Sequence, residues 1–400
     1  MSPAAALEAY LAAVTVEQLD ADPYPVFAHI RAVQPVAYVP CVDLWWAVTW
    51  DAVEEVASDH RRFAAKPIPS PIDRTFGEPN VLTEDGAEQR RLRRMLDPSF
   101  RPRIVEQYAP PLVEPLITEH LDALAGAGRG ELMADYFEPI SVISLARVLG
   151  LGMLEADTLR RWFAGLAEGV INYESDPARE AIGQATTREV DAVLRPILAE
   201  HLRAPDGSTV SAMLRAAEGD LDERLAQVLP TLKVILLGGM QEPGHGAGSV
   251  ALGLLSNPAQ AAAFAADPAG LARQAVEEGL RWISPIGTQT RRVVDATTVG
   301  GIPLPTGAGI SALLSSANRD EAMWGADADR FDLARTGPVQ AAFGYGTHYC
   351  VGHHFSRLQV QLAVQRLFER LPRLRLDPDH PPHVQGWEFR APRTLHVRWD

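Results

Sequence analysis

Residues 343–357 read FGYGTHYCVGHHFSR, and this stretch decides the fold. Gly344 and Gly346 allow a tight backbone turn with positive φ angles. Cys350 follows, and beyond Gly352 apolar residues recur three or four positions apart, which predicts a helix. We therefore expect Cys350 in a turn at a helix N-terminus, where N–H groups and the helix dipole lower a thiol pKa. A thiolate so placed could be a nucleophile, a redox centre or an axial metal ligand.

From the residues alone, two other interpretations of Cys350 stay open. It could be a buried free cysteine, which behaves as a small apolar side chain. It could also belong to a zinc site with His348, His353 and His354, although four ligands so close in sequence hardly reach tetrahedral geometry. Cys41 is the only other cysteine, so the chain lacks the residues for a disulfide framework or a four-cysteine metal site.

The pattern Phe-Gly-x-Gly-x-His-x-Cys-x-Gly resembles the haem-binding loop of the cytochrome P450 family of haem-thiolate oxygenases, with every fixed position filled. The resemblance implies a mainly α fold with small β-sheets, and haem b (iron protoporphyrin IX) between a long distal helix and the helix after the cysteine. It implies that Cys350 is the thiolate ligand of the haem iron, a ligand that favours O–O cleavage. It also implies that His348 contacts a haem propionate and that Phe343, Gly344 and Gly352 belong to the cofactor loop.

Glu278 and Arg281 resemble the Glu-x-x-Arg motif of the same family, which is structural. Residues three apart on a helix share a face, so the two side chains can form a buried pair with two hydrogen bonds. Matching segments run in the family's order from about residue 22 to residue 357, which is nearly the whole chain.

Two arginines resemble the propionate ligands of the family. Arg291 lies nine residues before a Gly-Gly turn, as the family's arginine does, although Arg292 beside it could take the role. Arg93 matches a second arginine in a segment that also holds a histidine in the family. Gln89 stands at that histidine position, which removes one possible positive charge and keeps a hydrogen-bond donor.

The expected distal helix departs from the family pattern at residues 236–243, LLGGMQEP. In the family an acid and an alcohol here relay protons to iron-bound dioxygen. Aligned on Gly238, Gln241 replaces the acid and Glu242 replaces the threonine, whereas a slip of one residue would put Glu242 at the acid position. Pro243 has no N–H, so we expect a kink in the helix there.

A carboxylate at the threonine position suits hydrogen peroxide, because Glu242 could take a proton from one peroxide oxygen and return it to the other. The resulting hypothesis is a peroxygenase that hydroxylates or dealkylates a small or medium apolar organic substrate. The alternative is a conventional monooxygenase that takes dioxygen and draws electrons from NAD(P)H through a ferredoxin reductase and a ferredoxin. A third reading is a haem-binding protein that recruits a partner and oxygenates nothing.

Family resemblance places the substrate pocket between the distal helix, the Pro-rich segment 66–82, the stretch 161–181 and residues 283–289. Segment 66–82 is aperiodic, so we expect it to be a long loop. The candidate lining residues in the pocket are Val81, Phe163, Val170, Gly238 and Ile286.

Composition bounds the class of protein. The 400 residues are 46% hydrophobic, and 37 Lys and Arg against 51 Asp and Glu give a net charge of −14. A chain this acidic repels a phosphate backbone, so nucleic-acid binding is disfavoured. The chain shows no signal peptide and no apolar run long enough for a membrane anchor, so we expect a cytoplasmic protein.

Apolar spacing predicts most of the secondary structure. It predicts helices over 105–127, 136–150, 157–169 and 177–202, a short one from 208, and a long distal helix from 222 to about 256. Strand-like patterns are confined to 35–49 and 288–310. No shift of composition marks a boundary, so we expect one domain over residues 1–400.

Overall fold

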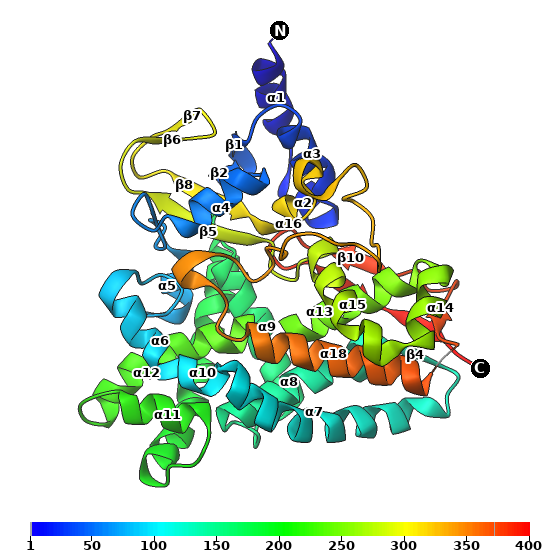
Figure 1. Cartoon of the computed structure of the whole chain (residues 1–400). Helices are drawn as coiled ribbons and strands as arrows, with labels where there is room; N and C mark the ends of the chain where they lie inside the picture. The colour runs from blue at the N-terminus through cyan, green and yellow to red at the C-terminus, as the bar shows by residue number, and fades with distance from the viewer. Residues whose placement is uncertain (1, 372) are drawn as a thin grey trace.

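The amphipathic runs form the helical body of the molecule (Figure 1). The computed structural model describes residues 2–371 and 373–400. The helices of this body are α6 (Gly86–Phe100), α7 (Pro102–Ala125), α8 (Glu138–Leu149), α9 (Ala156–Val170), α10 (Pro177–Arg203), α11 (Thr209–Ala216), α12 (Leu221–Gly238), α13 (Glu242–Leu255), α14 (Pro258–Ala266), α15 (Pro268–Trp282) and α18 (His353–Arg370). A single large apolar core joins them, and α18 packs on α7, α13 and α15.

A sheet of five strands and a set of short helices lie beside this body. The sheet has the order β1 (Val36–Val39), β2 (Leu44–Ala47), β8 (Gly309–Leu313), β5 (Thr288–Val293), β3 (Phe63–Ala64), and only the β2–β8 pair is parallel. The short helices are α1 (Pro3–Leu11), α2 (Val16–Ala21), α3 (Tyr24–Arg31), α4 (Trp50–Ser58), α5 (Pro71–Phe76), α16 (Leu314–Ala317) and α17 (Glu321–Trp324). The predicted mainly α fold with small sheets is confirmed.

The strands are more widespread than the sequence predicts. The two predicted regions form β1, β2, β5 and β8, and a hairpin of β6 (Thr297–Val299) with β7 (Ile302–Leu304). The expectation that strands are confined there is wrong, because the C-terminal segment pairs as well. Its strands are β9 (Arg375–Leu376) and β12 (His396–Arg398), which pair beside β4 (Arg129–Glu131), and the hairpin of β10 (His383–Gln385) with β11 (Ala391–Thr394). These strands have two to four residues, too few for an alternating pattern to be visible.

Two local expectations are corrected. Segment 66–82 is not an uninterrupted loop, since α5 lies within it and Ser70 caps the helix by accepting a hydrogen bond from the N–H of Asp73. The distal helix is not continuous either. It ends as α12 at Gly238 and begins again as α13 at Glu242, with three non-helical residues between them. Pro243 lies in the first turn of α13, where a missing N–H costs nothing.

Candidate active site

Cys350 lies in the predicted turn, three residues before α18. The turn reverses through Gly344 and Gly346, whose φ angles are +74° and +65°, values that a residue with a Cβ resists. The N–H of Cys350 donates to the carbonyl oxygen of Phe343 at 2.9 Å, which closes the loop. A Cβ added at Gly352 would lie 4.0 Å from the Sγ atom of Cys350. The sulfur therefore lies beside Gly352, a residue with no side chain to crowd it.

The thiol itself departs from the expectation. Burial raises the pKa of Cys350, and the N–H of Gly352 together with the charge of Arg93 only partly opposes this. The helix N-terminus is expected to lower the pKa of this thiol, but the effect of burial is larger. The zinc alternative has no support, because no group of three or more His, Cys, Asp or Glu side chains within the described residues is placed to hold a metal ion.

Arg291 points into the protein, whereas Arg292 does not. The Arg291 residue is 5% exposed, its Nη1 atom donates to the carbonyl oxygen of Thr290, and its Nη2 atom has no hydrogen-bond partner among the described residues. Burial lowers the pKa of Arg291 to about 10, and the charge of Asp85 acts in the opposite direction. Arg292 is half-buried and donates to the backbone of Lys66. A buried guanidinium with a free N–H fits an anionic group such as a haem propionate.

Helix α6 holds the cysteine turn through the two residues predicted there. Arg93 donates from Nη1 to the carbonyl oxygen of Tyr349 at 2.8 Å. Gln89 donates from Nε2 to the carbonyl oxygen of Thr347 at 2.7 Å. Both bonds fix the residues that flank His348, so the turn and α6 form one unit.

His348 faces the same helix. Its Nε2 atom lies 3.0 Å from an oxygen of Asp85, the residue before α6. Burial lowers the pKa of His348, and Asp85 acts against this. His348, Arg93 and Arg291 therefore lie on the same side of the cysteine turn. All three are cationic or can become so, and together they fit the two carboxylates of haem b.

Glu278 and Arg281 form the expected pair within α15. The Nε and Nη2 atoms of Arg281 donate to the two carboxylate oxygens of Glu278 at 2.7 and 2.8 Å. The guanidinium also donates to the carbonyl oxygens of Asn318, Ala328 and Arg330, each at 2.7 Å. The pair therefore ties the chain that leads to the cysteine turn onto α15.

The break between α12 and α13 contains the altered residues of the distal segment. Gly238 is exposed, and a Cβ added to it would meet nothing within 4 Å, so there is open space beside the end of α12. The break is tied to α8, because Ser141 donates to the carbonyl oxygen of Met240 at 2.6 Å and Gln241 donates to Glu138 at 3.3 Å. The side chain of Gln241 therefore binds α8.

Glu242 is buried and faces a histidine. One of its oxygens lies 3.4 Å from the Nδ1 atom of His245, one turn along α13, and neither oxygen has a hydrogen-bond partner among the residues described. The Nε2 atom of His245 lies 3.7 Å from Glu138 of α8. Burial alone would lower the pKa of His245, but Glu242 and Glu138 raise it to about 9. At neutral pH the imidazole is therefore a cation between two carboxylates.

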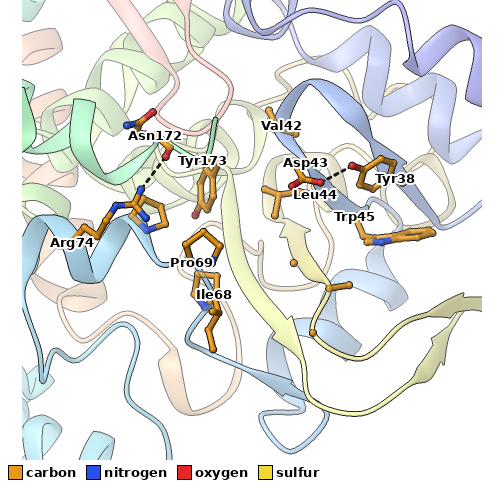
Figure 2. A pocket seen from close by; sticks show the side chains of 15 residues that line it. Tyr38, Val42, Asp43, Leu44, Trp45, Ile68, Pro69, Arg74, Asn172 and Tyr173 are labelled. Atoms are coloured by element: carbon orange, nitrogen blue, oxygen red, sulfur yellow. Dashed lines mark hydrogen bonds between the residues drawn. The ribbon is translucent and has the colours of Figure 1, made fainter. Parts of the chain in front are cut away.

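A cavity of about 240 Å³ opens between the β1–β2 hairpin and segment 66–82 (Figure 2). Its walls also come from residues 172–173 and 307–309, with Tyr173 between the two sides. The cavity uses two of the four segments named for the substrate pocket. None of the five predicted lining residues borders it: Val81, Phe163, Val170, Gly238 and Ile286.

Gly238 ends α12 at the distal break, and Phe163 and Ile286 are linked to this region through aromatic and backbone contacts. The ring of Phe163 packs edge-on to His245 at 5.9 Å between centroids and to Phe389 at 6.3 Å. Ile286 forms an isolated β-bridge with the same Phe389. Sequence reasoning missed Phe389, because it lies in the C-terminal segment where no strand is predicted.

Two buried carboxylates also escaped the sequence analysis. Glu138 is the first residue of α8 and, at that position, reads as an ordinary helix N-terminal acid. Glu388 is fully inside the protein and accepts a hydrogen bond from Thr288 at 3.1 Å, and burial raises its pKa to about 8. Only packing of distant segments places either group, so no local pattern reveals them.

Comparison with known proteins agrees with this architecture. The sequence model of the family Cytochrome P450 matches residues 270–388. Cytochrome P450 107B1 of Saccharopolyspora erythraea is 32% identical over 312 residues, which are 78% of this chain and 74% of that protein. The cytochrome P450 monooxygenase PikC of Streptomyces venezuelae is 29% identical over 95% of this chain and 91% of its own length.

Solved structures show the same fold. Myxobacterial CYP267B1 in complex with myristic acid is 28% identical, with a TM-score of 0.85 over 96% of this chain and 98% of its own. P450BioI, solved with a hexadec-9Z-enoic acid ligated acyl carrier protein, has a TM-score of 0.86 at 24% identity. The chain belongs to the cytochrome P450 family, and it is an enzyme of that family with haem b as its cofactor. No helix within the described residues is long and apolar enough to cross a membrane.

Proposed function

We propose that this P450 holds haem b with Cys350 as the axial ligand and oxygenates a small or medium apolar organic substrate, with residues 1–400 as one domain. The observation that carries this proposal is the position of Cys350, in a closed turn at the start of α18 and bonded through its neighbours to α6. Arg291, Arg93 and His348 would bind the propionates. When bound, haem supplies the iron at which an oxidant is activated and an oxygen atom passes to the substrate.

We further propose that Glu242 lets the enzyme use hydrogen peroxide. Residues 239–243 contain no hydroxyl side chain, and Glu242 is the one acid among them. Both oxygens of this carboxylate lack hydrogen bonds to the described residues, so it is free to exchange a proton. It would accept a proton from one peroxide oxygen and return it to the other, in the net reaction RH + H2O2 → ROH + H2O. The carboxylate is turned toward His245 and would reach the distal site by rotating its side chain.

A second candidate is the dioxygen-driven monooxygenase, supplied with electrons by a ferredoxin and its reductase. The relatives that are named monooxygenases and hydroxylases support it. The structure adds a reason of its own, because the buried His245 links Glu242 to Glu138 and thus toward the surface. Dioxygen chemistry consumes protons from solvent and needs such a link.

The substrate class rests on apolar lining and on relatives. Phe163, Phe389 and Ile286 give the region beside the distal break an apolar surface. The names of relatives include 6-deoxyerythronolide B hydroxylase and vitamin D(3) 25-hydroxylase, and one solved neighbour binds myristic acid. These molecules are rich in carbon and differ in shape, and what they share supports an apolar substrate.

Two experiments test the proposal. The reduced protein exposed to carbon monoxide should show the absorption shift of a thiolate-ligated haem, and Cys350→Ser should abolish it. Absence of that shift in the wild type would overturn the ligand assignment. Peroxide-driven oxidation of the best-binding member of a panel of myristic acid, vitamin D3 and 6-deoxyerythronolide B should fall about tenfold or more in Glu242→Thr. Equal or higher turnover in that variant would refute the peroxide role.

A further inference from the structure

The crossing of α8 and α13 places three titratable side chains in one buried row. The Nδ1 atom of His245 lies 3.4 Å from Glu242, and its Nε2 atom lies 3.7 Å from Glu138. The side chains of His245, Glu242 and Glu138 are 4%, 7% and 12% exposed. Each ring nitrogen therefore faces a different carboxylate, which is the arrangement that lets an imidazole pass a proton from one side to the other.

The outer end of the row reaches the surface. An oxygen of Glu138 contacts Arg160 of α9, whose side chain is 30% exposed. Asp157, which is 95% exposed, lies 4.0 Å from the same guanidinium. Glu138 therefore stands between a buried histidine and solvent, and protons from water can reach it beside Arg160.

The acidic groups around His245 favour its protonated form. Glu242 faces it from its own helix, Glu138 faces it from α8, and Arg160 of α9 lies behind Glu138. Burial acts to raise the pKa of Glu138, but His245 and Arg160 hold it below its ordinary value. Phe163 packs edge-on against the ring and carries no charge. The row thus keeps the ring of His245 protonated in the resting protein, with Glu242 on one side and Glu138 on the other.

The row exists because α8 and α13 approach closely. A Cβ added at Gly244 would lie 2.9 Å from the carbonyl oxygen of Phe137 and 3.1 Å from the Cα atom of Glu138. Both contacts are to backbone, which cannot move aside as a side chain can. Glycine at position 244 is therefore what allows His245 to reach Glu138, and this role explains one of the glycines in the distal segment.

We propose that Glu138, His245 and Glu242 form a proton path from solvent beside Arg160 to the distal site, and the proposal rests on the function proposed for Glu242. At rest both ring nitrogens of His245 carry a proton, and the ring first releases the Nδ1 proton to Glu242, so one N–H bond breaks and one O–H bond forms. The neutral ring then rotates and turns its bare Nδ1 atom toward Glu138. Glu138, protonated from water, gives its proton to Nδ1, so one O–H bond breaks, one N–H bond forms and the ring is again a cation.

The two oxidants differ in their need for this path. The dioxygen reaction, RH + O2 + 2e⁻ + 2H⁺ → ROH + H2O, takes two protons from solvent in each turnover. The peroxide reaction takes none, because the protons on peroxide leave in the water formed. A block at Glu138 should therefore slow the first reaction more than the second.

The experiment compares both reactions in Glu138→Gln, with the reporter substrate chosen above and with NADH, a ferredoxin and its reductase as the electron source. We expect the ratio of dioxygen-driven to peroxide-driven product to fall about tenfold or more. Glu138→Asp, which restores a carboxylate, should recover part of the ratio. Glu189→Gln is the matched control, because Glu189 also binds an arginine of α9, Arg161 at 2.7 Å, away from His245. It should leave the ratio unchanged.

A second measurement needs no turnover. With ¹⁵N-labelled histidine in the ferrous carbon monoxide form, NMR should show the His245 ring doubly protonated at pH 7, with a lower pKa in Glu138→Gln. A neutral ring at pH 7, or a ratio of products unchanged in both Glu138 variants, would overturn the path. Peroxide turnover unchanged in Glu242→Gln would instead overturn the proposed role of Glu242, so the two failures are distinguishable.

Discussion

The carboxylate of Glu278 and the guanidinium of Arg281 share two hydrogen bonds of 2.7 and 2.8 Å inside the protein, where the two side chains are 4% and 1% exposed. The Glu278 carboxylate also accepts from the N–H of Asp332 at 2.7 Å and from Arg335 at 3.2 Å. The pair therefore joins α15 to the segment that leads toward Cys350, and its loss would affect the fold before it affected chemistry.

We predict that Glu278→Gln lowers the free energy of unfolding by about 3–5 kcal/mol, because it leaves a buried guanidinium without its counter-charge. Urea denaturation followed by circular dichroism measures this loss. Glu369→Gln is the control, since Glu369 forms a pair of the same spacing with Arg366 at the surface. Glu369→Gln should lower the free energy of unfolding by about 1 kcal/mol or less. Equal effects of the two substitutions would contradict a special role for the buried pair.

Haem retention should depend on Arg291 and not on its neighbour. Arg291→Ala removes the buried guanidinium whose Nη2 atom has no hydrogen-bond partner among the described residues, and we expect purified protein with several-fold less haem per chain. The ratio of haem absorbance to protein absorbance measures this. Arg292→Ala, one position along the same strand, should keep the wild-type ratio. A loss of haem in Arg292→Ala alone would reverse the assignment of the two arginines.

Glu388 should make stability fall as pH rises. Burial raises its pKa from 4.5 to about 8 in the folded chain, so between these values the folded state holds a proton that the unfolded state releases. By linkage, the free energy of unfolding then decreases through this window, by up to about 1.4 kcal/mol per pH unit. Glu388→Gln is neutral at every pH and should remove this slope.

Thermal melts from pH 5 to pH 9 test this prediction. Glu388→Gln should match the wild type near pH 5 and be the more stable protein at pH 9. Glu369→Gln, a surface change, should follow the wild-type curve throughout. Parallel curves for wild type and Glu388→Gln would show that Glu388 stays ionised in the folded chain.

Gly244→Ala should push α13 away from α8. Its Cβ would meet backbone atoms of Phe137 and Glu138 within 3.1 Å, and we expect a loss of about 1–3 kcal/mol in stability. Wider spacing should also lower the pKa of His245, measured by NMR. Gly246→Ala is the control, because its Cβ would meet the flexible side chain of Leu280 at 3.0 Å, and the gain in helix propensity offsets that contact. A Gly244→Ala protein as stable as Gly246→Ala would contradict the close crossing.

Local pattern was enough for the helices and the cysteine turn. Apolar residues at helical spacing predict α7, α9 and α10 to within a few residues, because an amphipathic helix must bury one continuous stripe. The glycines before Cys350 predict the turn, because a residue without a Cβ can adopt the positive φ angles that the turn needs. Short C-terminal strands and the helix inside segment 66–82 could not be predicted this way, since pairing and packing with distant residues stabilise them.

By itself the sequence indicated the family, the cysteine loop, the Glu278–Arg281 spacing and a departure from the family pattern at Gln241 and Glu242. Those features depend on residues close together in the chain. Tertiary structure alone decided that Arg291 rather than Arg292 is buried and that Glu138 meets His245 from another helix. The reason is that burial and charge pairing depend on contacts between residues about a hundred positions apart. Such contacts cannot be predicted from the pattern of neighbouring residues.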